Sequence, residues 1–470
     1  MPSRLGTGDA LVVLGCLCLV LTMGVGAALA PATTVSTDAS TADGDVPRTL
    51  VGVQGVGSYH DGGSVRLLDG DGEGWRESSA PVYFDVTMLD DGSVLAGFMA
   101  GGYEDCGPYP ATCHRTGYRI IDPGAGAEPE VIDEWSFPVR NRVASEVHDV
   151  EPLPGGGFVV ADMEHERVFV VEGGEITWEW EASSRYEAPD DPTTQDWLHI
   201  NDVDRIGQGR FLVSVRNANQ LVVLERGEGV VEVINADRDD ATDDDGLVGD
   251  PSVLYHQHNP QWLGDGAVLV ADSENHRVVE LHRNDDGVWE PAWVLRGAAG
   301  QQFDWPRDAD RLPNGNTLIT DSLNHRVIEV TPRGEIVWEY YATWGPYEAE
   351  RIGTGDESNG PTMADQGATG SYQIYGSAGL IEGTGDSLTF ATAVQNTFAG
   401  TVIAGPALVF ADTWSGVTPW IRPVWMGSWA FAGSAAGLLV LVAWGLSETV
   451  GARARIGRGI RRAVRDLRTR

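Results

Sequence analysis

Residues 256–281 read HQHNPQWLGDGAVLVADSENHRVVEL, and residues 305–330 repeat the pattern as WPRDADRLPNGNTLITDSLNHRVIEV. Each copy alternates short apolar, β-branched runs with Gly, Asn and Asp, which is typical of antiparallel strands joined by tight turns. A unit of this length cannot bury its own faces, so the copies must pack against one another. The stretch therefore predicts blades of a β-propeller.

Weaker copies of the same pattern lie upstream. Five copies share an Asp or Asn at an equivalent position, which we call the marker: Asp85, Asp149, Asp202, Asn259 and Asp308. The steps between markers are 64, 53, 57 and 49 residues, and propeller blades are usually about 40–50 residues long with insertions in loops. Strand-like sequence between residues 49 and 75 indicates a further blade. We therefore expect an all-β, six-bladed propeller over residues 49–347, with five or seven blades as alternatives.

Apolar segments flank the predicted propeller. Residues 1–31 contain an apolar run that is long enough to span a bilayer and ends in Ala-Leu-Ala, so it is either a retained anchor or a signal segment. Residues 420–447 are expected to form a second transmembrane helix, with tryptophans at the interface positions. Between these segments we expect a flexible stalk at 32–48 and a Gly/Ser/Thr-rich linker at 348–419, and after them an Arg-rich tail at 448–470.

Charge separates the compartments. The chain has 69 acidic and 32 basic residues, all of the latter Arg, for a net charge of −37. An acidic surface suits solubility in concentrated salt and indicates a halophilic archaeon. It also argues against nucleic-acid binding, which needs a basic surface. The Arg-rich tail predicts cytoplasmic termini and a propeller outside the cell membrane. There, Cys106 and Cys113 are expected to form a disulfide.

The residues beside the markers carry the chemistry. Immediately before the markers stand Phe84, His148, Asn201, His258 and Arg307. If this position begins the innermost strand of each blade, these side chains converge on the propeller axis. Two residues earlier, on the same strand face by the period of two, stand His199 and His256. Arg216 occupies a turn position where the other repeats carry Asp.

Histidines at matched positions have two chemical interpretations. A single histidine at a strand start is more often structural, but three at equivalent positions favour a binding site. Neutral imidazoles suit zinc, copper or iron. Imidazole and guanidinium N–H groups equally suit an anion. A metal site would more often include a carboxylate and would avoid Arg216, so these residues favour an anion, without a metal or a cofactor.

Four segments resemble the aryl-sulfate sulfotransferase family. They are Trp197-Leu198-His199-Ile200-Asn201, Ser214-Val215-Arg216-Asn217, Gln257-His258-Asn259 and His148-Asp149. The resemblance covers roughly residues 146–340. It implies an extracytoplasmic six-bladed propeller that transfers a sulfuryl group from an aryl sulfate donor to a phenolic acceptor without a nucleotide donor.

The resemblance also implies residue roles. His258 would be the nucleophile that carries the sulfuryl group as a sulfohistidine. The sulfate oxygens would be held by His148, His199, Asn201 and Arg216. His199 or His148 would exchange protons with the phenols. From their repeat positions, His256 and Arg307 are expected to line the same substrate site.

Two other functions stay open at this point. A non-catalytic, membrane-tethered propeller would bind a partner or a glycan at the cell surface and would tolerate the loss of His258 and Arg216. A metal-dependent propeller hydrolase, such as a lactonase, would be disabled by chelation, but the position before the marker lacks the carboxylates that calcium requires. The transferase instead predicts activity without metal and its loss on His258→Ala.

Overall fold

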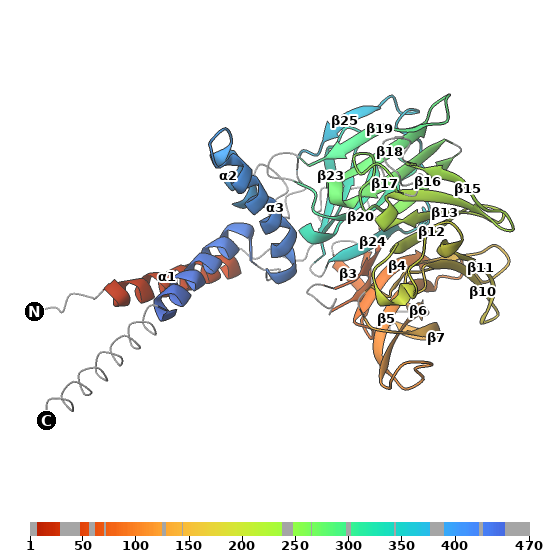
Figure 1. The fold of residues 1–470 in the computed structure, drawn as a ribbon, viewed down its shortest axis with the longest axis horizontal. Coiled ribbons are helices and arrows are strands. Elements are labelled where there is room, and N and C mark those ends of the chain that lie inside the picture. Colours follow the sequence, from red (N-terminus) through yellow and green to blue (C-terminus); the bar gives the residue numbers. More distant parts are fainter. Residues whose placement is uncertain are drawn as a thin grey trace, which may run out of the picture. The chain divides into compact units, whose positions relative to one another are not determined.

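The computed structural model describes residues 7–28, 48–55, 62–69, 72–124, 128–142, 144–236, 248–264, 266–297, 302–342, 345–376, 390–422 and 426–446. Six β-sheets, most of them four-stranded antiparallel meanders, make up its β-rich part (Figure 1). The predicted six-bladed propeller is thereby confirmed.

Five blades follow the chain in order. Their strands are β4–β7 (Val82–Met88, Val94–Tyr103, Cys113–Asp122, Glu130–Val139), β8–β11 (Val147–Pro152, Phe158–Asp162, Arg167–Glu172, Glu175–Glu181), β12–β15 (Ile200–Gly207, Arg210–Val215, Gln220–Glu225, Gly229–Ile234), β16–β19 (His258–Gly264, Ala267–Asp272, Arg277–Arg283, Trp289–Arg296) and β20–β23 (Pro306–Arg311, Thr317–Asp321, Arg326–Val330, Ile336–Tyr341). A disulfide joins Cys106 and Cys113 in the hairpin between β5 and β6.

The sixth blade joins the two ends of the propeller. Its outer strands β1 (Thr49–Val53), β2 (Ser64–Asp69) and β3 (Gly72–Glu77) come from the N-terminal side, whereas its innermost strand β24 (Pro346–Arg351) comes from the C-terminal side. Thr49 pairs with Arg351 in this sheet. The propeller thus extends past the predicted boundary at residue 347, because Tyr347-Glu348 lacks the Asp or Asn marker that identifies the other blades.

Apolar side chains between neighbouring blades form the core. One cluster, for example, joins Val159 and Val170 of one blade to Val213 and Val222 of the next. Because both faces of a blade are covered by its neighbours, a central strand such as β17 is buried along its whole length. Burial on both faces explains why these strands are nearly continuous apolar runs rather than strictly alternating ones.

Residues 348–419, expected to be a Gly/Ser/Thr-rich linker, contain regular structure. After β24, a segment at 352–368, which we call the cap segment, places Met363 and Ala368 in an apolar cluster with two blades. The strand β25 (Gly370–Gln373) then pairs in parallel with β19. The helices α2 (Phe390–Phe398) and α3 (Ala404–Ile421) follow. The apolar run that starts at residue 404 continues beyond the length of a strand and forms α3.

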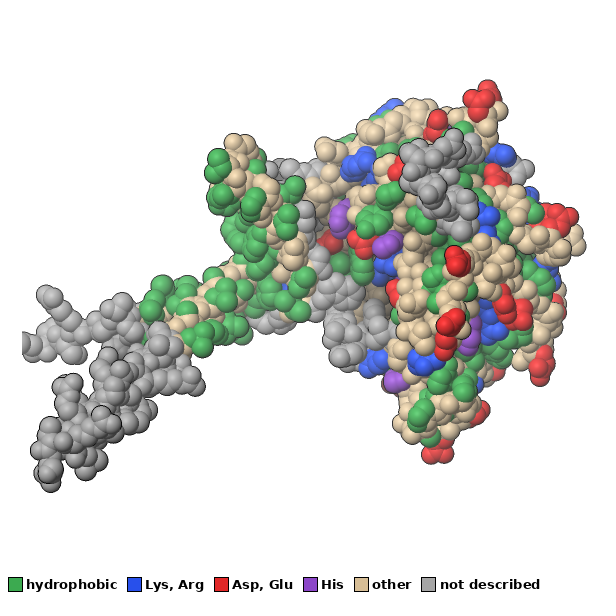
Figure 2. All heavy atoms as spheres, viewed as in Figure 1, with side chains coloured by type: hydrophobic (Ala, Val, Ile, Leu, Met, Phe, Trp, Pro, Cys, Tyr) green, Lys and Arg blue, Asp and Glu red, His purple; other side chains and the backbone are tan. Residues whose placement is uncertain are grey.

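The terminal helices form a second compact unit with residues 389–411. Within the described residues, the helix Ser428–Leu446 is the one long and apolar enough to cross a membrane, whereas the apolar part of α1 (Thr7–Ala28) spans only Leu11–Val25. Hydrophobic side chains cover these helices, and acidic ones are scattered over the propeller (Figure 2). The predicted tail at 448–470, and the stalk at 32–48 except its last residue, lie outside the described residues.

Candidate functional site

Every innermost strand bulges at the marker. The register against the second strand shifts between Tyr83 and Val86, Val147 and Val150, Ile200 and Asp202, His258 and Gln261, Pro306 and Asp308, and at Tyr347. In three blades the residue left out of the pairing is Asn201, Arg307 or Tyr347. A bulge sets two residues against one and re-aims side chains, often beside active sites. In these three blades the bulge therefore releases the residue before the marker from the ladder, whereas His258 stays paired with Ala271 and its bulge begins at Asn259.

The side chains before the markers gather around Tyr347, which the sixth blade contributes. Ring centroids lie 5.3 Å apart for Phe84 and Tyr347, 5.5 Å for His148 and Tyr347, and 6.2 Å for His258 and Tyr347. The guanidinium carbon of Arg307 lies 5.4 Å from the Tyr347 ring. The structure thus brings Phe84, His148, His258 and Arg307 together with Tyr347 in one buried cluster, which we call the imidazole pocket.

Hydrogen bonds fix the tautomer of His258. Its Nδ1 lies 2.9 Å from the hydroxyl of Ser273, and that hydroxyl donates its hydrogen to the Pro306 carbonyl at 2.7 Å. The Ser273 oxygen must therefore accept from His258, and Nδ1 carries the proton. The carbonyl of His256, at 3.2 Å, accepts from the same N–H. The other nitrogen, Nε2, is buried and has no hydrogen-bond partner among the described residues, which leaves its lone pair free.

The remaining histidines divide into two groups. His199 stacks on His148 at 5.3 Å between centroids and lies 6.5 Å from His258. Its Nδ1 contacts Asp196 Oδ1 at 2.7 Å. His256 is half-buried at the edge, 4.0 Å from the Glu274 carboxylate. The structure therefore places His199 inside the pocket and His256 at its rim.

The predicted strand position of these two histidines is wrong. His199, His256 and Trp305 precede the first residue of their strands and have positive φ angles of 55°, 49° and 57°. Such left-handed residues are uncommon outside glycine and mark a turn rather than a strand. The period of two consequently does not apply to them, and turn geometry places them at the pocket instead.

Arg216 also occupies a different position from the predicted one. Both Val215 and Asp272 end the second strand of their blades, so Val215 is the equivalent of the recurring Asp. Arg216 begins the following short 3-10 turn, at the position that Ser273 holds in the next blade. Its guanidinium donates to Asn217 at 2.7 Å and lies 3.9 Å from Glu274.

Arg307 is the more isolated cation. It is buried and stacks on Trp305, with its guanidinium carbon 4.5 Å from the ring centroid. No ion pair joins it to a carboxylate in the part of the chain that the structure describes, and its Nε has no hydrogen-bond partner there. Asn201 donates its amide N–H to the Gln257 carbonyl at 2.9 Å, which leaves the second amide hydrogen for another acceptor.

Burial and positive charge keep the pocket histidines neutral. Burial, then the charges of Arg307 and Arg216, hold the pKa of His258 well below its usual value. Burial lowers the pKa of His199 to about 4, against the opposing hydrogen bond from Asp196. Burial lowers the pKa of Arg307 to about 10, so that it stays protonated at neutral pH. The pocket therefore offers a neutral nucleophile between two cations.

Sequence reasoning missed Tyr347, Ser273 and Glu274. Tyr347 precedes Glu348 instead of an Asp or Asn marker, so the repeat pattern does not identify it. The one signal for it is that a sixth blade requires an innermost strand. Ser273 follows Asp272 in the turn that Ser322 repeats in the next blade, so its position resembled a structural turn. Glu274 comes close to Arg216 and His256 only through folding.

No family model and no curated protein matches this sequence. Solved structures resemble it in part. A Bacteroides caccae protein of unknown function is 14% identical with a TM-score of 0.42, covering 66% of this chain and 98% of the other. A putative 6-phosphogluconolactonase from Bacteroides uniformis is 11% identical (TM-score 0.38; 67% and 98%). A catalytically inactive virginiamycin B lyase from Staphylococcus aureus is 10% identical (0.36; 66% and 88%). Similarities this low carry no argument about function.

Proposed function

We propose that the protein transfers a sulfuryl group from an aryl sulfate to a phenol, with His258 as the covalent carrier. One observation supports this most: His258 Nε2 is an unprotonated, buried nitrogen without a hydrogen-bond partner among the described residues, while Ser273 holds the proton on Nδ1. Arg307 and Arg216 supply positive charge around it. A nucleophile set among cations suits attack on an anionic ester.

In the first half of the proposed reaction, His258 Nε2 attacks the sulfur of the donor. A nitrogen–sulfur bond forms, the bond from sulfur to the aryl oxygen breaks, and its electron pair leaves with the phenoxide. Arg307, Arg216 and the second amide hydrogen of Asn201 stabilise the sulfate oxygens. The Nδ1–H of the resulting sulfohistidine stays bonded to Ser273.

In the second half, His199 Nε2 removes the proton of the incoming phenol. The phenol oxygen attacks sulfur, and the electron pair of the broken nitrogen–sulfur bond returns to His258. Asp196, 2.7 Å from His199 Nδ1, stabilises the imidazolium. His199 then releases this proton to solvent, or keeps it and gives it to the phenoxide that leaves in the first half of the next cycle. Asp196 therefore favours His199 over His148 as the acid and base.

We further propose that α1 is a retained anchor and that the propeller lies outside the cell, with both termini in the cytoplasm. Within the terminal unit, Thr22 Oγ1 of α1 lies 2.7 Å from Ser434 Oγ of the helix Ser428–Leu446. A side chain at Gly433 would collide with Thr22, and small residues at such contacts favour pairing of membrane helices. The acid-rich composition further supports a host with concentrated salt.

Incubation of the full-length protein in detergent and high salt with p-nitrophenyl sulfate and a phenol tests this function. We expect phenolate release that depends on the acceptor. When the acceptor is omitted, peptide mass spectrometry should find one sulfuryl group on His258. His258→Ala should abolish both signals, and His276→Ala, a turn histidine outside the pocket, should preserve them. A folded His258→Ala variant that still transfers would overturn the proposal, as would a silent wild-type protein across several donors, which would favour a binding propeller.

A further inference from the structure

The five markers and Glu348, which holds the equivalent position in the sixth blade, form a second layer around the axis, which we call the marker layer. All six residues are buried: Asp85, Asp149, Asp202, Asn259, Asp308 and Glu348. One oxygen of several markers binds the next blade: Asp85 Oδ2 accepts the Val150 N–H at 3.2 Å, and Asp308 Oδ2 accepts the Ala349 N–H at 3.1 Å. These bonds explain the recurrence of Asp without any ligand.

The second oxygens of the markers are not explained by blade contacts. Asp85 Oδ1, Asp202 Oδ1, Asp308 Oδ1 and Glu348 Oε1 have no hydrogen-bond partner among the described residues. Asn259 Oδ1, a neutral amide oxygen at the same position of its blade, has none there either. Buried polar atoms normally have partners, so a set of acceptors without donors calls for a bound species that attracts oxygen.

Three of the carboxylates converge. Asp85 of β4, Glu348 of β24 and Asp356 of the cap segment each offer an oxygen, and these oxygens lie within 4.8 Å of one another. Two oxygens on opposite sides of one calcium ion, each about 2.4 Å from it, are about 4.8 Å apart. All three residues are buried. Their spacing therefore fits ligands of a single cation.

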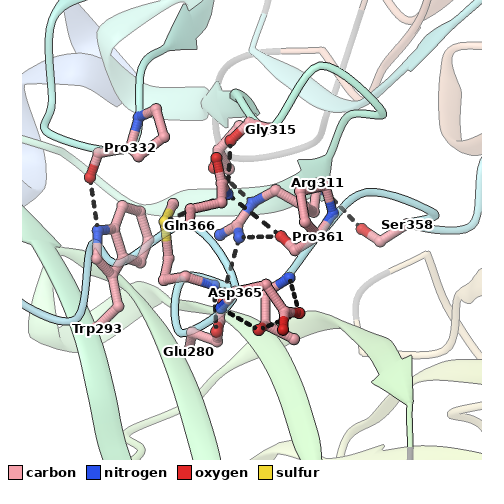
Figure 3. A network of polar contacts seen from close by, with 12 residues as sticks. Glu280, Trp293, Arg311, Gly315, Pro332, Ser358, Pro361, Asp365 and Gln366 are labelled. Atoms are coloured by element: carbon pink, nitrogen blue, oxygen red, sulfur yellow. Dashed lines mark hydrogen bonds and ion pairs between the residues drawn. The ribbon is translucent and has the colours of Figure 1, made fainter.

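The cap segment that carries Asp356 is held firmly on the propeller (Figure 3). Ser358 Oγ accepts the backbone N–H of Arg311 at 2.7 Å, and the Ser358 N–H donates to Gln261 at 2.6 Å. Arg311 also donates to the Pro361 carbonyl at 2.9 Å and forms a 3.0 Å ion pair with Glu280. Asp356 thus reaches the other two carboxylates from an anchored backbone.

Arginines do not neutralise this cluster in the part of the chain that the structure describes. Three buried guanidiniums of the neighbouring strands are paired elsewhere, in the pairs Arg311–Glu280, Arg326–Asp321 and Arg351–Glu329. A fourth, Arg307, lies against the rings of Trp305 and Tyr347. A buried charge is costly unless it is paired or coordinates a metal.

We propose that Asp85, Glu348 and Asp356 bind a divalent cation in the marker layer, with calcium as the best-fitting ion. Asp85 and Glu348 directly follow the pocket residues Phe84 and Tyr347 in sequence, so this site adjoins the imidazole pocket. Hard oxygen ligands and the absence of sulfur or nitrogen donors among the three suit calcium. The other markers, including Asn259, offer further oxygens as additional ligands. The ion ties β24 to β4 and to the cap segment. It therefore stabilises ring closure and the pocket floor, and it takes no part in bond making.

Metal content and thermal unfolding of the full-length protein in detergent and KCl test this site. After EDTA treatment and removal of the chelator, we expect the melting temperature to fall by about 5 °C or more and to recover with CaCl2. Elemental analysis of the restored protein should find about one calcium per chain. A protein that binds no divalent metal, and whose melting temperature ignores both EDTA and calcium, would show that protons or potassium balance the carboxylates and would overturn the proposal.

Variants assign the ligands. Asp85→Asn with Glu348→Gln should lose the bound calcium and most of its thermal shift, yet melt higher than the wild type in EDTA because repulsion is removed. Asp356→Asn, on the cap segment, provides a second variant if the first does not fold. Asp321→Asn alters an equally buried but arginine-paired carboxylate and should keep the calcium response. Calcium that persists in both ligand variants would overturn the assignment. Neither readout depends on transferase activity, so the two proposals succeed or fail separately.

Discussion

The imidazole pocket and the marker layer occupy neighbouring residues of the same six strands, yet their polar groups are opposite in kind. Among the described residues, the pocket presents a nitrogen without a hydrogen-bond partner on His258 and on Arg307, whereas the marker layer presents such oxygens on Asp85 and Glu348. Burial makes both sets costly on their own. We therefore propose a different ligand for each layer, an anion in the pocket and a cation in the marker layer.

The bulge is what allows this contrast. In a regular strand, consecutive side chains point to opposite faces. At a bulge, two consecutive residues oppose one partner residue, so that Tyr347 leaves the ladder while its neighbour Glu348 stays paired with Gly52. One local irregularity, repeated in six blades, thus gives the fold two stacked sites of opposite charge.

Removal of positive charge from the pocket should have the largest effect on transfer. We expect Arg307→Gln to lower kcat/KM for aryl sulfate by about 10²- to 10³-fold, because a buried cation near the sulfate oxygens is lost. Arg307→Lys should recover only part, since Lys cannot reproduce the planar stacking on Trp305. Steady-state kinetics with an unchanged melting temperature checks this. Full activity in Arg307→Gln would remove Arg307 from the site.

Loss of the hydroxyl that orients His258 should have an intermediate effect. Ser273→Ala leaves only the longer bond to the His256 carbonyl, so the tautomer with a free Nε2 is less populated, and we expect transfer to fall about 10- to 100-fold. The ring-nitrogen NMR shifts of His258 report the tautomer directly, and Ser273→Thr should restore both readouts. Ser322→Ala, at the matching position of the next blade, is the control. An unshifted spectrum in Ser273→Ala would contradict this role.

Acidification should have a small effect until the pH is well below 6.5. The reactive form of His258 is unprotonated, and its lowered pKa keeps that form fully populated where an ordinary histidine would be half protonated. The rate of the donor half-reaction should therefore stay nearly constant as the pH falls through 6.5 and decline only at lower pH. Stability should also fall between pH 6.5 and 4, because the unfolded chain binds the His199 proton that the folded chain excludes. An acid limb near pH 6.5 in quenched single-turnover measurements would be evidence against a buried neutral nucleophile.

The disulfide should matter least to either layer. Cys106→Ser with Cys113→Ser opens a short loop in one outer hairpin, for which chain entropy predicts a loss of about 2 kcal/mol in unfolding free energy. Denaturant titration measures that loss. The transfer rate and the calcium response should be unchanged, and a change in either would show that this hairpin is coupled to the axis.

The repeats predicted the blades because strand and turn chemistry is local. The pocket required more than repeats. His199, His256 and Trp305 reach it through left-handed turns that strand periodicity does not describe. Arg216 holds the position of Ser273 in the next blade, which is one residue after the recurring Asp with which the sequence repeats align it. The sequence shows the marker carboxylates, which align the repeats. It does not show which of them use both oxygens in hydrogen bonds between blades and which keep one oxygen for a ligand.

The closure of the sixth blade by β24 also sets the timing of folding. Arg351 reaches Thr49 across 302 residues of chain, and translation at about 5–20 residues per second needs roughly 15–60 s to span that distance. Until β24 has been synthesised, the edge of β1 that it will pair with is exposed, and the axis lacks both Tyr347 and Glu348. Neither layer of the axis is complete before the ribosome has passed residue 351, so the nascent chain must be protected from edge-to-edge aggregation for most of its synthesis.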